Sequence, residues 1–253
     1  MLRSGLPVLV TRPEQQADSL CDSLKTIGCT PVRLPMLEIV AVVETPQLKK
    51  CFLDIDLFQA VIAISRNAAE AGLEYLDQYW PQFPVGIDWI AVGPVTAKVM
   101  KAAGMEVKMP AERFDSEGTL ELDCLQAENV TGKKVLIWRG VGGRETLASV
   151  LTERGAQVEY AELYERNVPQ HSVEQWQAAL QQSPLLVVSS GQGLEAVAAQ
   201  QPKIAEQVRG IIAPSARVAD IAQSLGFSSI QIAASAQDND MIAAIKQWQQ
   251  NND

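Results

Sequence analysis

Val8-Leu9-Val10-Thr11-Arg12-Pro13, near the start of the chain, is matched in the second half by Val135-Leu136-Ile137-Trp138-Arg139-Gly140. Two further pairs follow in the same order: VIAIS at 61–65 with LLVVS at 185–189, and WIAVGP at 89–94 with GIIAP at 210–214. Equivalent residues of the three pairs lie 127, 124 and 120 positions apart. Segments that recur in order at nearly constant spacing predict two homologous units.

The chain alternates short β-branched runs with amphipathic helical segments, which is typical of parallel sheets covered by helices. We expect strands at 7–11, 30–34, 60–64, 88–92, 105–109, 134–138, 156–160, 185–188, 210–213 and 229–233. The predicted fold class is therefore α/β, with two similar parallel-sheet domains. In such sheets ligands bind beyond the carboxyl ends of the strands, which is where the repeated polar residues lie.

The charge balance limits the partners. The 253 residues include 21 Lys and Arg against 30 Asp and Glu, a net charge of −9. This charge does not attract nucleic acid or an anionic membrane, so we expect neither as a partner. An anionic ligand must then be held by local groups.

Cysteine and histidine usage gives two more expectations. The four cysteines are scattered along the chain, and His171 is the only histidine. This pattern predicts no metal site and a reducing compartment. We also find no signal-peptide pattern and no apolar run of membrane-spanning length, and so expect a cytoplasmic protein.

The glycine-rich segment Arg139–Arg144 (RGVGGR) follows a predicted strand and precedes a helix. Its backbone N–H groups and two guanidiniums can bind an anion, so Arg139, Gly142 and Arg144 are candidate ligand-binding residues. The alternative is an ordinary glycine-rich turn with solvated arginines. A dinucleotide fingerprint would need glycine at Glu145, and a phosphate-binding P-loop pattern is absent, so nucleotide binding is not expected.

Further candidates lie at or just after other strand ends. The serine and threonine hydroxyls among them either cap a helix or bind a ligand. They are Arg12, Ser65, Asn67, Gly93, Thr96, Ser189, Ser190, Gly191 and Ser215. Tyr164 lies in a connecting segment beside Glu162, Glu165 and Arg166. From the residues alone it is either a tyrosine at the edge of the core or a phenol that faces a cleft.

Six segments together resemble the uroporphyrinogen-III synthase family. They are Leu9–Pro13, Ala91–Ala97, Arg139–Glu145, Tyr164-x-Arg166, Ser215–Ala219 and Asp238–Asp240. Each motif is weak alone, but their order across nearly the whole chain is specific, and the likeness is greatest to the gamma-proteobacterial branch. The family has a hydroxyl-bearing Gly-Pro-Thr-Thr-like turn, for which Ser215 in Ala213–Arg217 is the nearest substitute.

The resemblance implies a cofactor-free lyase of haem and other tetrapyrrole biosynthesis that works as a monomer. The substrate would be hydroxymethylbilane, a linear tetrapyrrole with acetate and propionate arms, which loses water and closes with ring D inverted to give uroporphyrinogen III. Without enzyme the same molecule closes to the type I isomer. The resemblance also implies that Thr96 and Tyr164 line the cleft, with Tyr164 as the catalytic aid to loss of the hydroxyl.

The resemblance changes the expected domain boundaries. The repeats alone suggest a tandem division near residue 130. The family fold instead implies one domain from residues 1–35 and 170–253 and a second from 39–165. A two-stranded antiparallel linker at about 36–42 and 161–168 would join them, with the active site in the inter-domain cleft.

Two other classes of protein fit part of the sequence. A two-domain anion-binding protein would bind its ligand tightly without turnover, although such proteins are usually exported. A nucleotide-dependent α/β enzyme is opposed by the missing glycine fingerprints.

Overall fold

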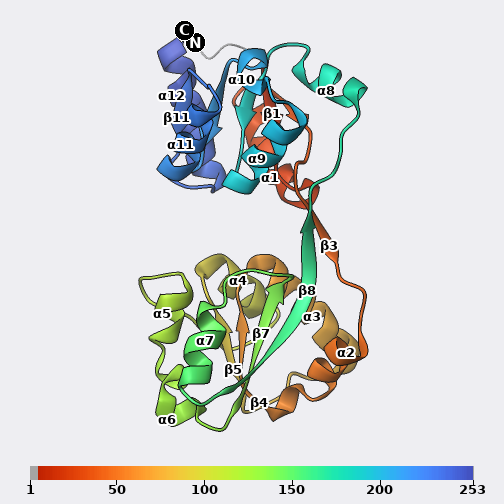
Figure 1. The fold of residues 1–253 in the computed structure, drawn as a ribbon, viewed down its shortest axis with the longest axis vertical. Helices are drawn as coiled ribbons and strands as arrows, with labels where there is room; N and C mark the ends of the chain where they lie inside the picture. The colour runs from red at the N-terminus through yellow and green to blue at the C-terminus, as the bar shows by residue number, and fades with distance from the viewer. Residues whose placement is uncertain (1–4, 253) are drawn as a thin grey trace. The chain divides into compact units, whose positions relative to one another are not determined.

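A computed structural model describes residues 5–252, and its contacts divide the chain into two compact units. The outer unit combines the segment that ends at Glu38 with the segment that begins at Asn167, and the central unit is Ile39–Arg166. In Figure 1 the red N-terminal segment and the blue C-terminal third belong to the same unit. A tandem division near residue 130 is therefore wrong, because that position lies inside the central unit.

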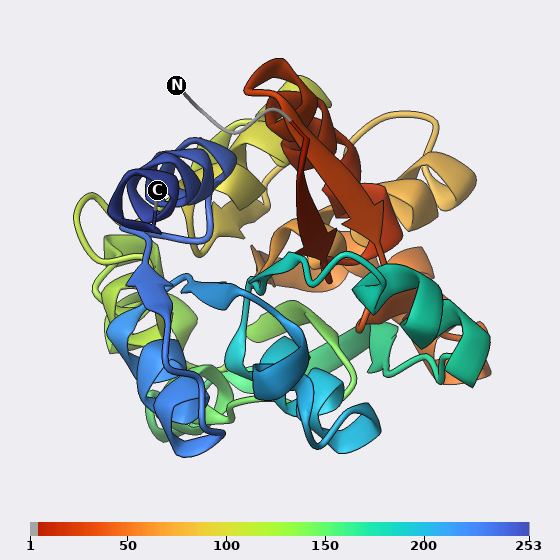
Figure 2. The ribbon, with the colours of Figure 1, turned by 90° about the horizontal axis from the view of Figure 1, so that it is seen from above.

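The outer unit is built on a parallel five-stranded sheet in the order β11-β10-β9-β1-β2. Its strands are β1 (Leu6–Val10), β2 (Cys29–Arg33), β9 (Leu185–Val187), β10 (Gly210–Ala213) and β11 (Ile230–Ile232). Helices α1 (Glu14–Thr26) and α12 (Asp238–Asn252) pack on one face. Helices α8 (Val173–Leu180), α9 (Gly191–Gln200) and α11 (Ala216–Ser224) cover the other face, with α10 (Ile204–Gln207) between α9 and β10. Figure 2 shows α12 in dark blue where the chain ends.

The central unit has a six-stranded sheet in the order β3-β8-β7-β4-β5-β6. Its strands are β3 (Glu38–Ala41), β4 (Phe58–Ala63), β5 (Asp88–Ala91), β6 (Val107–Lys108), β7 (Lys134–Gly140) and β8 (Gln157–Asn167). Helices α2 (Pro46–Leu53), α3 (Arg66–Tyr79) and α4 (Pro94–Ala102) cover one face. The other face packs against α5 (Ser116–Leu120), α6 (Ala127–Val130) and α7 (Thr146–Glu153).

The sequence repeat corresponds to equivalent strands in the two sheets. The repeated runs form β1 and β7, β9 and β4, and β10 and β5, so each pair has one member in each unit. Five strands of the outer unit follow the order β2-β1-β9-β10-β11, and five of the central unit follow the same order as β8-β7-β4-β5-β6. The prediction of two similar parallel-sheet α/β domains is therefore confirmed.

The strands largely match the segments predicted from periodicity, and strand structure also covers the two stretches where the resemblance implied linker strands. β8 does not end near residue 160 but continues to Asn167, so the segment around Tyr164 is a strand. β3 is an additional strand beside β8, and Val42 N–H donates to the Leu163 carbonyl at 3.2 Å. The chain passes between the units in these two neighbouring strands.

The core of the central unit is centred on Trp138 of β7, which is fully buried. Its ring lies 5.7 Å from the rings of both Phe52 and Trp89, measured between centroids. A Cβ atom at Gly72 would lie only 2.3 Å from the Trp138 ring, so glycine is needed there to let α3 approach the sheet. Buried aromatic rings of this size contribute much of the stability of a core.

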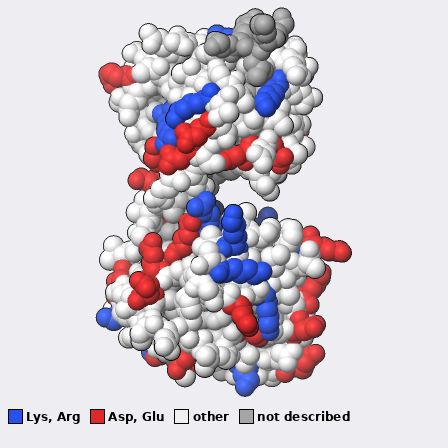
Figure 3. Space-filling view, turned by 180° about the vertical axis from the view of Figure 1, so that it is seen from behind, with Lys and Arg blue, Asp and Glu red and all other residues white. Residues whose placement is uncertain are grey.

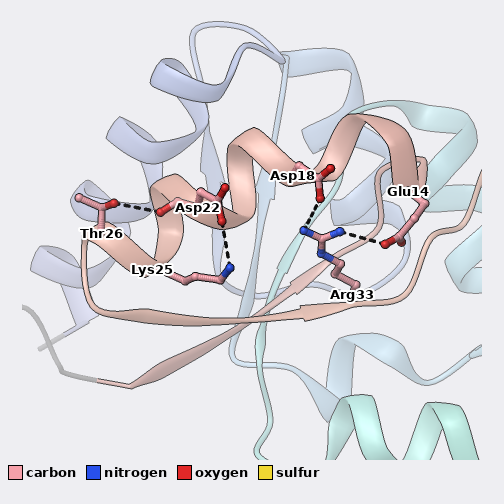
Figure 4. A network of polar contacts seen from close by, with 6 residues as sticks. All are labelled: Glu14, Asp18, Asp22, Lys25, Thr26 and Arg33. Carbon is pink, nitrogen blue, oxygen red and sulfur yellow. Dashed lines mark hydrogen bonds and ion pairs between the residues drawn. The ribbon is translucent and has the colours of Figure 1, made fainter.

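On the surface of the outer unit, Arg33 joins β2 to α1 (Figure 4). Its guanidinium pairs with Glu14 at 2.9 Å and with Asp18 at 2.6 Å, two carboxylates one helical turn apart. Lys25 and Thr26 contact Asp22 farther along the helix. The carboxylates and Lys25 are exposed and Arg33 is only half-buried, so each pair adds little to stability, about 0–1 kcal/mol.

Candidate functional site

The carboxyl edge of the central sheet brings together several of the predicted site residues. Ser65 follows β4, Gly93 follows β5, and Gly140 is the last residue of β7. These strands are neighbours and parallel, so their carboxyl ends meet at one edge. The helices that begin there direct their free N–H groups toward the same side, which favours an anionic ligand.

Tyr164 of β8 lies at this edge opposite Gly140. The pairing of β7 with β8 shifts register between Arg139 and Gly140, and this shift places Tyr164 beside the glycine. A Cβ atom at position 140 would lie 2.8 Å from the tyrosine ring, so only glycine leaves room for it. Register shifts of this kind re-aim side chains next to functional sites.

The Tyr164 hydroxyl is part of a polar contact network although the residue is only 3% exposed. Its oxygen lies 3.0 Å from Ser65 Oγ and accepts a hydrogen bond from Arg166 Nη2 at 3.3 Å. Tyr164 is thus a tyrosine at the edge of the core, because its ring packs in the core. Its hydroxyl nevertheless reaches polar groups at the strand ends. A cleft-facing role for the phenol stays a prediction.

The glycine-rich segment is held by the chain's own carboxylates. Arg139 is 3% exposed, and its guanidinium pairs with Glu145 at 3.0 Å and Glu162 at 3.8 Å. It also lies over the Tyr160 ring, 4.4 Å from the centroid. Gly142 N–H donates to Glu162 Oε1 at 3.3 Å. Direct binding of a ligand by Arg139 or Gly142 would therefore require the ligand to replace these carboxylates.

Arg144 differs from Arg139 in its surroundings. It lies between Gly143 and Glu145 on the exposed surface and makes no ion pair with another described residue. The segment thus has one buried guanidinium that organises it and one exposed guanidinium that a ligand can reach. Arg144 is the better candidate for contact with an anion.

Glu145 accepts hydrogen bonds from the Tyr160 hydroxyl and from Arg139, and these contacts lower its pKa from the ordinary 4.5. The pKa of Tyr160 is raised to about 12, by burial first and by Glu145 second. Because the folded-state pKa of Glu145 is lowered, its ionised form stabilises the fold above its unfolded pKa. That contribution is lost as pH falls through the lowered value.

We expect Glu145→Gln to make the thermal stability of the protein depend less on pH under acidic conditions. Between pH 7 and pH 3 the wild type should lose thermal stability more steeply than the variant, and the difference should appear below about pH 4.5. The effect should be modest because the Glu145 side chain is 60% exposed. Thermal unfolding midpoints measured across this range test it. Glu153→Gln, on the exposed part of α7, is the control, and parallel curves for wild type and Glu145→Gln would contradict the expectation.

Three predicted serines cap helices. Ser65 accepts from Ala68 N–H at 3.2 Å, Ser190 from Gly193 N–H at 3.1 Å, and Ser215 from Val218 N–H at 3.4 Å. Capping occupies a lone pair of each oxygen and leaves the hydroxyl proton available for donation. The capping role and the donor role are therefore compatible.

The other candidates of the central unit lie in the first turns of α3 and α4. Asn67 is half-buried near the start of α3. Gly93 is the N-cap of α4, and Thr96 lies in the first turn of that helix, only 5% exposed.

The outer unit has its own carboxyl edge. Arg12 follows β1, Ser189, Ser190 and Gly191 follow β9, and Ser215 follows β10. Arg12 is 7% exposed and donates to Asp238 and to the Ala236 carbonyl, which fastens the segment before α12. Direct binding by Arg12 would require it to exchange Asp238 for a ligand carboxylate. Ser215 is exposed, and the serines after β9 are half-buried.

Charge on the surface is mixed. On the face drawn in Figure 3, Lys and Arg side chains occur together with Asp and Glu in both units. On this face an anionic ligand would meet basic groups that have acidic neighbours. In the described part of the chain, no helix is long and apolar enough to cross a membrane.

The sequence interpretation missed two features of this site. It did not include Arg166 among the site residues, although Arg166 donates to the Tyr164 hydroxyl. It also did not foresee that Ser65 and Tyr164, 99 positions apart, share a hydrogen bond. The glycine at the end of β7 was the available signal, because glycine at a strand end indicates a close approach by another group.

Two parallel α/β sheets with polar groups at their carboxyl edges define a class of proteins that bind ligands beyond the strand ends. Within that class, residues 8–243 match the family model described as uroporphyrinogen-III synthase HemD. The chain belongs to the uroporphyrinogen-III synthase family, and the resemblance predicted from its motifs is confirmed.

Individual relatives agree. The chain is 30% identical to the uroporphyrinogen-III synthase of Escherichia coli over 253 residues, which covers 95% of this chain and 100% of that one. It is 30% identical to the Salmonella typhimurium enzyme over 248 residues, with the same coverage.

Solved structures show the same fold. A crystal structure of a mutant uroporphyrinogen III synthase from Thermus thermophilus superposes with a TM-score of 0.63 at 15% identity, covering 98% of this chain and 100% of that one. The uroporphyrinogen-III synthetase of Helicobacter pylori gives 0.63 at 16% identity, covering 96% and 99%.

Proposed function

We propose that this protein catalyses the dehydrative cyclisation of hydroxymethylbilane with inversion of ring D, yielding uroporphyrinogen III, and is thus a cyclising lyase of tetrapyrrole biosynthesis. Membership of the family supports the reaction. The observation that carries the proposal is the Tyr164 hydroxyl, held by Ser65 and Arg166 where three parallel strands end. Loss of the substrate hydroxyl needs a proton, and a positioned phenol is a proton donor of the required kind.

In this proposal the protein binds the substrate through the substrate's acetate and propionate carboxylates. A chain with net charge −9 can hold a polycarboxylate through helix N-termini and a few arginines, because these act at short range. We infer that Arg144 and the start of α4, with Gly93 and Thr96, contribute. The helix starts of the outer unit offer N–H groups of the same kind.

Positioning is the main catalytic task in this proposal. The substituted carbon of ring D, rather than its free carbon, must meet the cation left by the departing hydroxyl. Holding two reacting groups in place can lower a barrier by up to roughly 7–11 kcal/mol in the best intramolecular cases. Many weak contacts along a flexible substrate suit that task better than one strongly basic or acidic group.

We expect Arg144→Ala to raise the KM for hydroxymethylbilane by about 10- to 150-fold with kcat little changed. The lost charged hydrogen bond is worth about 1.5–3 kcal/mol, and it holds substrate and transition state alike. Lys133→Ala is a matched control because Lys133 is exposed at the opposite, amino edge of the same sheet. Steady-state kinetics on both variants test the prediction. An unchanged KM for Arg144→Ala would show that Arg144 is only a solvated surface residue.

The second candidate function is an anion-binding protein of two domains without turnover. The helix starts and Arg144 would serve that role equally well. The two are separated by incubating hydroxymethylbilane in large excess over protein. An enzyme consumes the whole excess at a rate proportional to protein concentration, whereas a binding protein alters the fate of at most one equivalent.

We also propose that the protein acts in the cytoplasm. All four cysteines are free, which suits a reducing compartment. A monomeric state stays a prediction, and light scattering of the purified protein tests it.

A further inference from the structure

The hydrogen bonds around Tyr164 restrict where its proton can go. Arg166 is a guanidinium and can only donate, so at 3.3 Å the Tyr164 oxygen is the acceptor. The Tyr164 proton must therefore point elsewhere. Ser65 Oγ, at 3.0 Å, is the polar atom placed to accept it.

The hydrogen bonds of Ser65 fix the direction of its own proton as well. Its oxygen accepts from Ala68 N–H at 3.2 Å, which is the helix cap of α3. If Ser65 donated to Tyr164, the proton of a residue that is 3% exposed would be left without an acceptor, which is costly for a buried polar group. If Tyr164 donates to Ser65, both oxygens are satisfied, and the Ser65 proton is free to point outward. Ser65 is half-buried, so this proton is accessible from the carboxyl edge of the sheet.

We infer that Ser65 is the group that protonates the substrate hydroxyl and that Tyr164 supplies the proton from behind. This inference rests on the proposed function and refines it. Ser65 is then the catalytic residue in contact with substrate, Tyr164 is its proton source, and Arg166 is a positioning residue. Gly140 supports the arrangement because it leaves room for the Tyr164 ring.

The proton balance closes without another reactant. The Ser65 hydroxyl gives its proton to the hydroxyl oxygen of hydroxymethylbilane as the carbon–oxygen bond breaks, and that oxygen keeps the bonding electrons and leaves as water. Ser65 takes the proton of Tyr164, which leaves a phenolate beside the Arg166 cation. The substituted carbon of ring D attacks the carbon cation and has no proton to lose. The bond from that carbon to ring C then breaks and re-forms at the free carbon of ring D, and the proton that this carbon loses returns to the phenolate through Ser65.

Three substitutions separate the relay from the helix cap, since Ser65 serves both. Ser65→Thr keeps the cap and a hydroxyl proton. Ser65→Asn keeps a side chain that caps helices well but has no hydroxyl to pass a proton on. Ser65→Ala removes both. Far-UV circular dichroism and thermal unfolding of each variant report the cap, and single-turnover rates with hydroxymethylbilane report the relay.

We expect Ser65→Asn to unfold near the wild-type temperature yet to react about 10²-fold more slowly, within the range for loss of a general acid. Ser65→Ala should be comparably slow and less stable, and Ser65→Thr should recover most of the rate. The double variant Ser65→Asn, Tyr164→Phe should be no slower than the slower single variant, because the two groups act in series.

The outcomes distinguish this inference from the function on which it rests. If the wild type forms the type III isomer but Ser65→Asn reacts as fast as the wild type, the relay is wrong and the proposed function stands. Multiplying effects in the double variant would likewise overturn the relay, because they would show independent roles. If the wild type yields only the type I isomer, the proposed function fails, and the inference fails with it.

Discussion

Replacing Tyr164 with Phe is expected to lower kcat by about 10²–10⁴-fold while leaving the fold intact. The reason is chemical: the phenol is the proton source for loss of the substrate hydroxyl, and removing a general acid costs a factor of this size. The ring remains in its place above Gly140, so packing changes little. Because the proton is needed in the transition state rather than for binding, KM should change far less than kcat.

The control for this variant is Tyr79→Phe. Tyr79 belongs to the same unit, and Tyr79→Phe also removes a hydrogen-bonded hydroxyl, because the Tyr79 O–H donates to Glu44 Oε2 at 2.5 Å. It lies at the far end of α3 from Ser65, away from the carboxyl edge of the sheet. Steady-state kinetics on both variants should show a large loss only at Tyr164. A Tyr164→Phe enzyme within a factor of two of the wild type would remove Tyr164 from the mechanism.

Replacing Trp138 with Ala is expected to destabilise the central unit by about 3–5 kcal/mol, the usual cost of truncating a large buried ring. Trp138 is fully buried and packs against Phe52, Trp89 and α3 at Gly72, so the cavity could not collapse without moving three elements. Hydrogen exchange followed by peptide mass spectrometry in increasing urea assigns the loss to one unit. This matters because two units need not unfold together.

A milder substitution provides the comparison. The indole N–H of Trp138 has no hydrogen-bond partner among the described residues. Trp138→Phe removes this unpaired donor and keeps most of the ring, so its cost should be well below that of Trp138→Ala. Exchange in β1 and β2 of the outer unit should stay at wild-type levels in both variants. A loss below about 1 kcal/mol for Trp138→Ala would contradict the central place of this ring in the core.

Much of the architecture follows from periodicity in the sequence. Runs such as Val61–Ile64 and Leu185–Val188 are too apolar for a surface strand, and each is followed by a helix, so parallel sheets with both faces covered were predictable. Their recurrence predicted two similar sheets. Because the ends of parallel strands meet at one edge, the positions of Ser65, Gly93 and Gly140 at such an edge were predictable as well.

Other features depend on tertiary contacts that no local pattern shows. The extension of β8 through Tyr164 comes from pairing with both β7 and β3, and its register shift at Gly140 depends on that pairing. Arg139 pairs with Glu145 and Glu162 because the fold brings these two carboxylates close to it. The glycine-rich segment suggested two free guanidiniums, whereas the fold leaves one of them exposed.

The reaction itself is the central claim, and one measurement tests it most directly. Freshly generated hydroxymethylbilane is incubated with and without the protein, the products are oxidised to porphyrins, and the type I and type III isomers are separated by chromatography. We expect type I without protein and a shift to type III with it. Type I alone from a folded sample would contradict the proposed function and favour the anion-binding alternative.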